Sequence, residues 1–600
     1  MTEMASFSLR LLATAIALTL LAPADRAAGG EPLFTDVTAA SGLDFVHFNG
    51  MTGDLLFPEI AGSGGALFDF DGDGDLDAYL VQGSLLTREA KLEDALIAPR
   101  GALTDRLLRN DPGPRGTPRF TDVTKASGLE AEDYGMGVAA GDYDNDGDID
   151  LYVANLGSNR LWRNRGDGTF EDVTTASGSD DDRWSIGASF ADFDGDGWLD
   201  LFVVNYVRFD VERNVRCFEK SSRLDYCGPA AFDAEADRLL RNRGDGTFED
   251  VSLTSGIGRQ KGAGLGVATA DFNGDGRLDF YVANDGMLNF LWTNRGDGTF
   301  EEDALFAGIA VNRNGKAEAS MGVDAGDFDG DGDADLFMTH LMGETNTLYI
   351  NDGSGLFEDR TVEMGLGESS LPFTSFGTAW FDADLDGRLD LVIANGAVSF
   401  TDRRPGPETP YPLEQPNQFF RQRSDGRFED ASAEAGKAFL GPEVSRGLAL
   451  GDLDNDGDGD LLLINNSGPA RVLLNRWGDD RPWLGLRLVT GERDAFGARV
   501  ELLAAADEAA TKNPKKSRWG RVRSDGSYAS AHDPRVVFGL GDDFQPQSVR
   551  VYWPDGSQET WPAPPLGRYT SLVQGASTPS PAESKQGEPG EPPPAEERTP

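Results

Sequence analysis

Seven copies of one acidic nine-residue segment recur along this chain of 600 residues. Positions 1, 3, 5 and 9 are Asp in every copy except for Asn273, and position 6 is always Gly. Position 7 is Asp, Trp or Arg, so its side chain is not restricted in the same way. The copies begin at Asp69, Asp142, Asp192, Asp271, Asp327, Asp382 and Asp452. One local structure must therefore form seven times, which limits the chain to a repeat architecture.

The restricted positions have the chemistry of a calcium loop. Hard cations bind oxygen, which the acids at positions 1, 3, 5 and 9 supply from their side chains. A main-chain carbonyl from position 7 would complete the set and would leave that side chain free to vary. Glycine at position 6 permits the tight reversal that brings these oxygens round one point. Three His and two Cys in the whole chain leave few ligands for softer metals.

The sequence therefore predicts up to seven structural Ca²⁺ ions, with position 7 contributing its carbonyl only. In the first three loops the predicted ligands are Asp69, Asp71, Asp73, Asp75, Asp77, Asp142, Asp144, Asp146, Asp148, Asp150, Asp192, Asp194, Asp196, Trp198 and Asp200. In the last four loops they are Asp271, Asn273, Asp275, Arg277, Asp279, Asp327, Asp329, Asp331, Asp333, Asp335, Asp382, Asp384, Asp386, Arg388, Asp390, Asp452, Asp454, Asp456, Asp458 and Asp460.

Two other interpretations explain the acidic segments less well. One such segment alone could be a turn that binds nothing, because Asp and Gly are common in turns. Seven copies in the same register argue against that interpretation. An EF-hand needs Glu at position 12, between two helices. Here position 12 is apolar in every copy, namely Leu80, Val153, Val203, Val282, Met338, Ile393 and Leu463, so an EF-hand is excluded.

Two loops depart from the pattern. Asn273 keeps an oxygen ligand in the fourth loop but loses one negative charge. In the sixth loop Leu385 stands at position 4, where the other copies have Gly or Asn. We therefore expect strain in that loop and a weaker cation site there.

The similarity between copies extends beyond the acidic segment. A glycine stands five residues before each first Asp, and a second small residue, Gly or Ser, stands two residues earlier. Downstream come a β-rich run such as DLYVAN, then in most copies N-x-L-x-x-N, and then an F-E-D-V-T strand. A period of roughly fifty residues with four strands per unit indicates a propeller. The fold class predicted is therefore all-β, a seven-bladed β-propeller followed by a small β-rich C-terminal domain.

The ends of the repeat region predict how the ring closes. The last repeat ends at Arg471 to Asn475 and lacks its own F-E-D-V-T strand. An unpartnered copy, FTDVTAASGL, begins at Phe34. We expect it to complete the seventh blade and remove both open edges.

These motifs resemble the FG-GAP/VCBS calcium propellers, the group that includes the integrin α-subunit head. Beyond the last blade, SYASAHDPRVVFGLG (Ser527 to Gly541) and WPDG (Trp553 to Gly556) look like an ASPIC/UnbV domain. Together with an export signal, this architecture is similar to the cartilage acidic protein family and its bacterial relatives. The resemblance implies a scaffold and no particular reaction.

The predicted domain order is a signal peptide (residues 1–24), the propeller (31–478), the ASPIC/UnbV domain (480–573) and a Pro- and Glu-rich tail (575–600). Arg10, an apolar run from Leu11 and the small residues Ala22 and Ala24 are typical of a secretory signal. The tail has the composition of a disordered segment. We expect an exported protein, periplasmic or extracellular. Cys217 and Cys227 lie in one insertion, and export favours a disulfide between them over two free thiols.

The net charge of −48 limits the classes of partner. So acidic a surface disfavours nucleic acid and anionic membranes. No segment after the signal is long enough to span a bilayer. A basic partner would suit this charge, although solubility alone is a common reason for an acidic surface.

Strand direction places the calcium loops on one face of the propeller. The three longest insertions, about Val81 to Asp105, Asn205 to Asp237 and Asn395 to Pro416, all follow a second strand and share the opposite face. A polar residue begins each such connection, namely Gln82, Asn155, Asn205, Asn284, His340, Asn395 and Asn465. These side chains are candidates for contact with a partner; the alternative is that they cap strand ends or start turns.

Three functions compete. The first is a monomeric, secreted or periplasmic, calcium-stabilised module that binds or adheres to a protein or glycan through the insertion face. The second is an enzyme, lyase-like, acting on a carbohydrate or other small molecule in the axial pocket. It would need a deep pocket with converging polar groups. A purely structural role is third. No Ser/His/Asp or Cys/His arrangement is recognisable, so the sequence favours binding and assigns no catalytic residue or organic cofactor.

Overall fold

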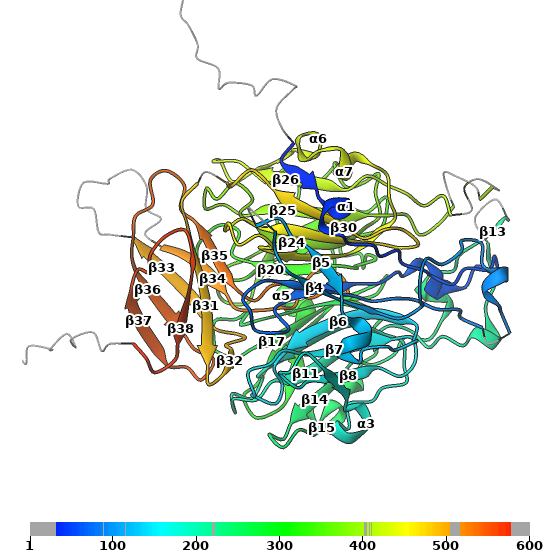
Figure 1. The fold of residues 1–600 in the computed structure, drawn as a ribbon, viewed down its shortest axis with the longest axis horizontal. Coiled ribbons are helices and arrows are strands. Elements are labelled where there is room, and N and C mark those ends of the chain that lie inside the picture. The colour runs from blue at the N-terminus through cyan, green and yellow to red at the C-terminus, as the bar shows by residue number, and fades with distance from the viewer. Residues whose placement is uncertain are drawn as a thin grey trace, which may run out of the picture.

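The computed structural model describes residues 32–577, except for 88, 114–115, 219–221, 401–404, 407–408, 410, 480 and 505–516. The predicted signal peptide and all but the first residues of the predicted tail lie outside the described residues. A ring of β-sheets forms the larger part of the molecule, and a smaller β-domain packs against one side of it (Figure 1). No helix in the described part of the chain has the length and apolarity to cross a membrane.

Seven antiparallel sheets of four strands build the ring, one for each acidic loop. The innermost strands are β2 (Gly65–Phe68), β6 (Gly135–Gly141), β10 (Ser185–Ala191), β16 (Gly264–Ala270), β20 (Val323–Gly326), β24 (Ser375–Phe381) and β28 (Ser445–Gly451). The second strands are β3 (Asp77–Leu80), β7 (Asp150–Asn155), β11 (Asp200–Asn205), β17 (Asp279–Asn284), β21 (Asp335–Met338), β25 (Asp390–Asn395) and β29 (Asp460–Asn465).

The outer half of each sheet carries two further strands. The third strands are β4 (Arg106–Asn110), β8 (Arg160–Asn164), β14 (Arg238–Asn242), β18 (Phe290–Asn294), β22 (Thr347–Asn351), β26 (Gln418–Gln422) and β30 (Arg471–Asn475). The fourth strands are β5 (Phe120–Asp122), β9 (Phe170–Asp172), β15 (Phe248–Asp250), β19 (Phe300–Glu302), β23 (Phe357–Asp359), β27 (Phe428–Asp430) and β1 (Phe34–Asp36).

The ring closes between the two ends of the repeat region, as the sequence predicts. β1 pairs antiparallel with β30, with Phe34 opposite Asn475. Each innermost strand contacts the next, and β28 contacts β2. The second strands are buried along their whole length because another sheet covers each of their faces, which explains their continuous apolar runs. The all-β propeller is therefore the fold of this chain.

A four-residue helix follows most fourth strands, and the D-V-T-x-x-S-G pattern explains it. The N–H of Thr124 donates to Asp122 Oδ1 (3.0 Å), and the helix ends at Gly128, whose φ of 82° suits glycine. The α-helices are α1 (Thr38–Ser41), α2 (Thr124–Ser127), α3 (Thr174–Ser177), α4 (Ser252–Ser255), α5 (Ala304–Ala307), α6 (Ser432–Ala435) and α7 (Lys437–Leu440). Short 3-10 helices are η1 (Phe57–Ile60), η2 (Leu92–Asp94), η4 (Val211–Arg213), η5 (Pro229–Ala231) and η6 (Ile257–Arg259).

The C-terminal domain consists of two sheets. In one, β31 (Trp483–Thr490) pairs with β32 (Arg493–Asp494), with β35 (Val536–Gly539) and, in parallel, with β38 (Tyr569–Val573). The other contains β33 (Arg499–Ala504), β34 (Ser517–Arg521), β36 (Pro546–Tyr552) and β37 (Gln558–Pro562). One hydrophobic cluster joins this domain to the propeller, and it includes Tyr143 and Leu199 beside Leu484 and Phe496. The two parts thus share a continuous apolar core.

Candidate calcium sites and partner face

Each acidic loop is folded by its own carboxylates. In the second loop, Asp142 accepts the N–H groups of Asp146 (3.2 Å) and Gly147 (2.8 Å). Asp150, at position 9, accepts the N–H of Tyr143 (3.1 Å). The first and last acids therefore hold the loop closed round the remaining oxygens.

Positions 4 and 6 of the loops have positive φ, which explains their Gly and Asn residues. In the second loop φ is 59° at Asn145 and 93° at Gly147. Leu385, the predicted exception, has a φ of 52° and is therefore strained. Its side chain is buried, and its carbonyl accepts the N–H of Gly541 (2.9 Å) from the C-terminal domain. Contact with that domain offsets the strain that the sequence predicts.

Carboxylate oxygens converge within these loops. Groups of three acids have oxygens within 4.8 Å of one another, namely Asp69, Asp71 and Asp77; Asp142, Asp144 and Asp146; Asp192, Asp194 and Asp200; Asp327, Asp329 and Asp335; and Asp382, Asp384 and Asp386. Two further groups bring the total to seven. Buried Oδ1 atoms of Asp144, Asp454 and Asp458 have no hydrogen-bond partner in the described residues. Clustered oxygens with unused lone pairs fit a divalent cation of the calcium type.

The electrostatics of the loops also favour a cation. Burial, reinforced by the neighbouring carboxylates, raises the pKa values of Asp142 and Asp144 to about 6. The same causes raise the pKa of Asp382 to about 8. Ionised carboxylates in these loops therefore repel one another in the protein alone, and a bound Ca²⁺ would supply the compensating charge.

Replacing Asp146 by Ala should destabilise the protein more than replacing Asp148 by Ala. The carboxylate of Asp146 belongs to the cluster formed with Asp142 and Asp144. Asp148, at position 7, contacts this cluster through its main chain, because its N–H donates to Asp146 Oδ1 (3.0 Å). Losing a calcium site filled about 100-fold above its Kd costs about 2.7 kcal/mol. Thermal unfolding in calcium-containing buffer measures the difference, and equal melting temperatures for the two variants would contradict these roles.

A ring of amides links neighbouring blades beneath the loops. The N–H of Asn164 donates to Asp150 Oδ1 (2.8 Å), and its Nδ2 donates to the carbonyl of Phe70 in the preceding loop (2.8 Å). The same inter-blade bond recurs at all seven junctions, from Asn110, Asn164, Asn242, Asn294, Asn351, Gln422 and Asn475. The second Asn of N-x-L-x-x-N is the sequence signal for this role, but the spacing alone does not reveal its acceptor in the preceding blade.

The axis of the propeller is filled by a segment of the C-terminal domain. Ser527 forms an antiparallel bridge with Val323, and Ala531 a parallel bridge with Ala66, so the segment runs inside the ring of innermost strands. The hydroxyl of Tyr528 donates to the carbonyl of Ala61 (3.1 Å). We call residues 522–533 the axial segment.

Buried charges fix the axial segment in place. Arg523 forms an ion pair with Asp324 (2.5 Å), whose side chain is fully buried. Asp525 accepts the N–H of Thr269. The small residues at the axis are also explained, because a Cβ on Gly64 would lie 1.7 Å from the carbonyl oxygen of Ala529. Contact with the second domain is therefore one reason for a glycine at this position of the innermost strand.

The axial pocket that an enzymatic function would use is occupied by this segment. On the side of the insertions, the ring of Tyr528 packs against Phe376 with centroids 4.9 Å apart. Arg446, fully buried beside them, donates to the carbonyls of Ile60, Gly396 and Ala397 (2.9 Å each). A cavity of about 240 Å³ lies instead between the calcium loops and the C-terminal domain, where it is lined by Asp382, Asp452, Arg521 and Trp519.

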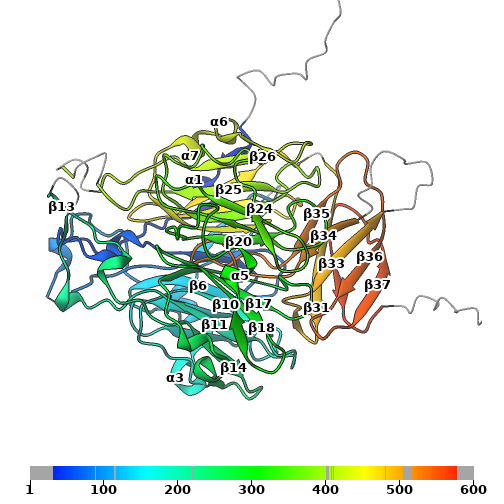
Figure 2. The same cartoon turned by 180° about the vertical axis from the view of Figure 1, so that it is seen from behind.

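The face that carries the calcium loops is covered by the C-terminal domain. Arg493 donates to the carbonyl of Gly197 in the third loop (3.1 Å), and Arg535 donates to that of Asp452 in the seventh (3.0 Å). The ring of Trp519 lies against Gly332 in the fifth loop. Figures 1 and 2 show this domain, coloured orange to red, on the side of the propeller opposite to strand β13 (Leu224–Asp225).

The polar residues that begin the insertion-face connections are buried. Gln82, Asn155, Asn205, Asn284, His340, Asn395 and Asn465 are all at most 2% exposed. Asn155 Nδ2 donates to the carbonyl of Ser158 (2.8 Å), and Asn205 Oδ1 accepts the hydroxyl of Ser185 (2.7 Å). These contacts are those of strand-end turns, the alternative that the sequence left open. In this conformation the side chains cannot reach a partner.

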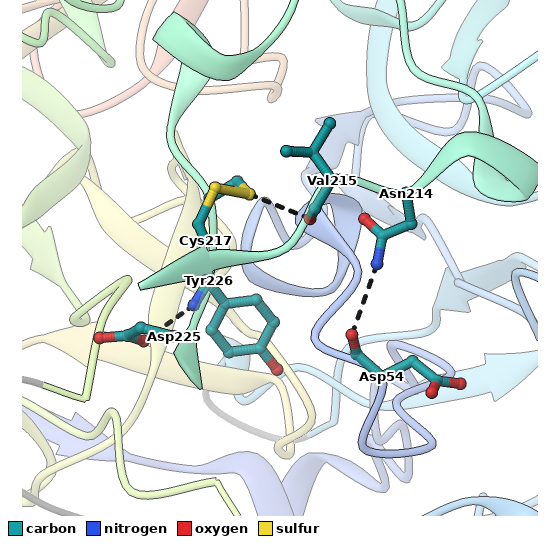
Figure 3. Close-up of a disulfide and its surroundings, with 7 residues drawn as sticks. Asp54, Asn214, Val215, Cys217, Asp225 and Tyr226 are labelled. Carbon is teal, nitrogen blue, oxygen red and sulfur yellow. Dashed lines mark hydrogen bonds between the residues drawn. A yellow bond between two sulfur atoms is a disulfide. The ribbon is translucent and has the colours of Figure 1, made fainter. Parts of the chain in front are cut away.

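The exposed part of the insertion face is built by the long loops. Cys217 and Cys227 form a disulfide (S–S 2.03 Å), the pairing expected from the sequence. The disulfide closes a hairpin of β12 (Cys217–Phe218) and β13 (Leu224–Asp225), which lies beside the loop of Asp54 (Figure 3). Tyr226 donates to Glu59 Oε2 (2.8 Å) and so ties the hairpin to the buried base of the face.

Comparison with known proteins agrees with this architecture. The FG-GAP-like repeat model matches residues 142–203, 226–282 and 271–338, and the ASPIC and UnbV model matches residues 489–579. Cartilage acidic protein 1 of Homo sapiens is 29% identical over 341 residues, which is 55% of this chain and 46% of that protein. The Mus musculus protein is 27% identical over 340 residues, 55% of this chain and 48% of that protein. The chain thus spans about half the length of these relatives.

A solved structure also resembles the chain. It is an Agrocybe aegerita protein described as recognising non-reducing terminal N-acetylglucosamine, with 18% identity and a TM-score of 0.34. The alignment covers 62% of this chain and 89% of that protein. The sequence matches thus identify FG-GAP-like repeats in the propeller and an ASPIC/UnbV domain after it, and they show that 55% of the chain is similar to cartilage acidic protein 1.

Proposed function

We propose that this protein is an exported, calcium-stabilised binding or adhesion module that engages a protein or glycan through its insertion face. One observation carries the proposal: the axial segment fills the centre, and the C-terminal domain covers the calcium face. The insertion face is the broad end of the propeller that remains exposed. Length variation between repeats collects on that face, as is usual for binding loops on a rigid scaffold.

Calcium has a structural role in this proposal. Up to seven Ca²⁺ ions would hold the loops that space the blades, while the C-terminal domain braces the same loops from outside. A rigid platform of this kind reduces the entropy lost when its surface loops bind a partner. The disulfide supports export, because disulfides persist in oxidising compartments. We propose that the protein acts as a monomer.

Deleting whole insertions would be a poor test of the proposal. Such a test requires that the deleted segment, for example that between Cys217 and Cys227, can be removed with little loss of stability. Asp225 and Tyr226 within it are buried, and Asp225 accepts the N–H of Phe400 (3.2 Å) from another insertion. Deletion would therefore disrupt the base of the face as well as its surface.

Surface substitutions separate binding from stability. Leu92, Leu96 and Phe218 are exposed on the insertion face, and Leu305 and Phe306 are exposed on the outer helix α5. We expect the triple Leu92→Ser, Leu96→Ser, Phe218→Ser variant to lose at least about tenfold in affinity for ligands that the calcium-loaded protein captures on protein and glycan arrays. Its melting temperature should stay close to that of the parent.

The matched control is the Leu305→Ser, Phe306→Ser variant, which removes similar apolar area from another side of the propeller. It should keep the affinity of the parent for the same ligands. If the α5 variant loses the ligands while the insertion-face variant retains them, the partner site is elsewhere and the proposal is wrong.

A further inference from the structure

The cavity of about 240 Å³ between the propeller and the C-terminal domain has the size of a small-molecule site. We call it the interdomain cavity. Strands β34 and β35 of the C-terminal domain lie beside β20 of the propeller, and residues of all three strands line the cavity (Figure 2). An apolar cavity of about 150 Å³ can hold one benzene ring. The interdomain cavity therefore has room for one ring with a small substituent.

Arg521, at the end of β34, lines this cavity and has no ion-pair partner among the described residues. Its guanidinium donates to the main-chain carbonyls of Thr269 and Ala325 only. Because a guanidinium has five N–H donors, several of them stay free for a ligand. Burial and the charge of Arg523 lower the pKa of Arg521 to about 10, which is the direction expected for a cation that lacks an anion.

Two further arginines line the cavity beside Arg521. Arg499 is its partner in the register of β33 and β34, so both side chains lie on one face of the hairpin. This pair stands at the end of the two strands that residues 505–516 do not join. Arg523 is compensated by Asp324 (2.5 Å), whereas Arg499 comes only within 4.0 Å of Asp271. Like charges on opposed residues destabilise a strand pair, so an anion beside Arg521 would relieve their repulsion.

The acids that line the cavity are engaged by other groups. The first Asp of each of loops four to seven accepts at least two main-chain N–H groups of its own loop. The side chains of Asp333 and Asp458, at position 7, lie beside the turns that follow the third strands of their blades. Asp533 forms an ion pair with Arg535 (2.8 Å). Among the charged groups of the described wall, Arg521 thus keeps the most unused hydrogen-bonding capacity.

Much of the remaining wall is apolar. Leu389 and Leu450 from the propeller and Val537 from β35 line the cavity, and each is only partly buried. Covering such surface stabilises a complex by roughly 25 cal/mol per Å². A concave, mostly apolar wall with few free polar groups is typical of small-molecule sites, where the polar groups fix the orientation of the ligand. One unpaired arginine beside this wall favours a ligand with one anionic group and an apolar body.

We propose that the interdomain cavity binds a small organic acid, a carboxylate on an apolar body about the size of one ring. Arg521 would hold the carboxylate through two N–H groups, the geometry that a guanidinium favours. Leu389, Leu450 and Val537 would cover the apolar body. A ligand there contacts both domains and would strengthen their association. This site lies outside the insertion face, so the inference does not depend on the partner proposed for that face.

Isothermal titration calorimetry of the calcium-loaded full chain tests the proposal with benzoate, uncharged benzamide, acetate and inorganic phosphate. We expect benzoate to bind and to raise the melting temperature. The other three should bind at least about tenfold more weakly, because each lacks the charge or the ring. Benzamide binding as tightly as benzoate would show that no anion is recognised, and phosphate binding as tightly would show that the apolar wall is not used. Either result, or no binding of benzoate, would overturn the proposal.

Two variants locate the ligand. Arg521→Gln should lose at least about tenfold in affinity for benzoate. Val537→Phe keeps Arg521 but fills the apolar part of the cavity, so it should lose a similar factor and tests the site without removing a charge. Melting temperatures close to that of the parent show that both variants are folded. Benzoate binding that neither variant weakens would place the ligand elsewhere and overturn the proposal.

The matched control is Arg518→Gln, which removes an arginine from the same strand. Arg518 donates to the carbonyls of Asp386 and Gly539 at the domain contact, but it is not among the described residues that line the cavity. This variant should bind benzoate as the parent does. Equal losses in Arg518→Gln and Arg521→Gln would mean that only the contact between the domains is sensed, and the proposed site would be wrong.

Discussion

Removing calcium with a chelator is expected to lower the melting temperature of this protein strongly. At least five of the loops bring oxygens of three carboxylates within 4.8 Å of one another, and no cationic side chain recurs at one position of all seven nine-residue segments to replace a metal. A site filled about 100-fold above its Kd adds about 2.7 kcal/mol of stability. Two or three such sites already approach the typical net stability of a domain, about 5–15 kcal/mol.

The effect should reach beyond the loops themselves. The C-terminal domain rests on them, through Arg493 on the third loop and Arg535 on the seventh. Amides from the third strands also tie each loop to the next blade. Opening of the loops would therefore weaken the contacts between blades and between domains together.

Differential scanning calorimetry with chelator, followed by added Ca²⁺ or Mg²⁺, measures this effect. Calcium should restore the melting temperature better than magnesium, because magnesium demands a smaller and stricter octahedron. In the chelated protein, stability should also fall as the pH rises from the ordinary pKa of 3.8 through the raised pKa values of Asp142 (about 6) and Asp382 (about 8). Groups whose pKa is raised on folding stabilise the folded state only while they are protonated. A melting curve that chelator leaves unmoved would contradict the metal-scaffold interpretation.

Replacing Tyr528 by Ala is expected to cost about 3–5 kcal/mol, the usual range for truncating a buried aromatic side chain. Tyr528 is 1% exposed, and its ring packs on Phe376 while its hydroxyl donates to Ala61. The truncation would leave a cavity at the centre of the propeller. Because Tyr528 belongs to the C-terminal domain, the loss should also weaken the joining of the two parts.

Urea unfolding of Tyr528→Ala and Tyr528→Phe separates the ring from the hydroxyl. The Phe variant keeps the packing and loses one hydrogen bond, so we expect it to cost only about 1 kcal/mol. Limited proteolysis should release the C-terminal domain from the Ala variant sooner than from the Phe variant. If both variants are as stable as the parent, residue 528 does not fill the axis.

The features that the sequence predicts correctly are those encoded by local spacing. The acids of each loop are at most eight residues apart, and the four strands of a blade follow one another along the chain. Closure by the strand at Phe34 could be predicted because the last repeat lacks an F-E-D-V-T strand, while an extra copy of that strand stands before the first repeat. The amides of the third strands were equally regular, yet their acceptors belong to the preceding blade, and their role therefore needed coordinates.

The sequence by itself thus determined the repeated unit, the convergent carboxylates, the closed ring and the cysteine pair. Tertiary structure alone decided the course of the axial segment and the burial of the polar set from Asn155 to Asn465. Contacts such as Ser527 with Val323 and Arg523 with Asp324 join residues about two hundred positions apart. Each contact occurs only once, so no repeated sequence motif predicts it. They depend on how the surface of one domain fits the centre of another, which local spacing does not encode. The exposed face, and with it the proposed binding site, follows from that fit.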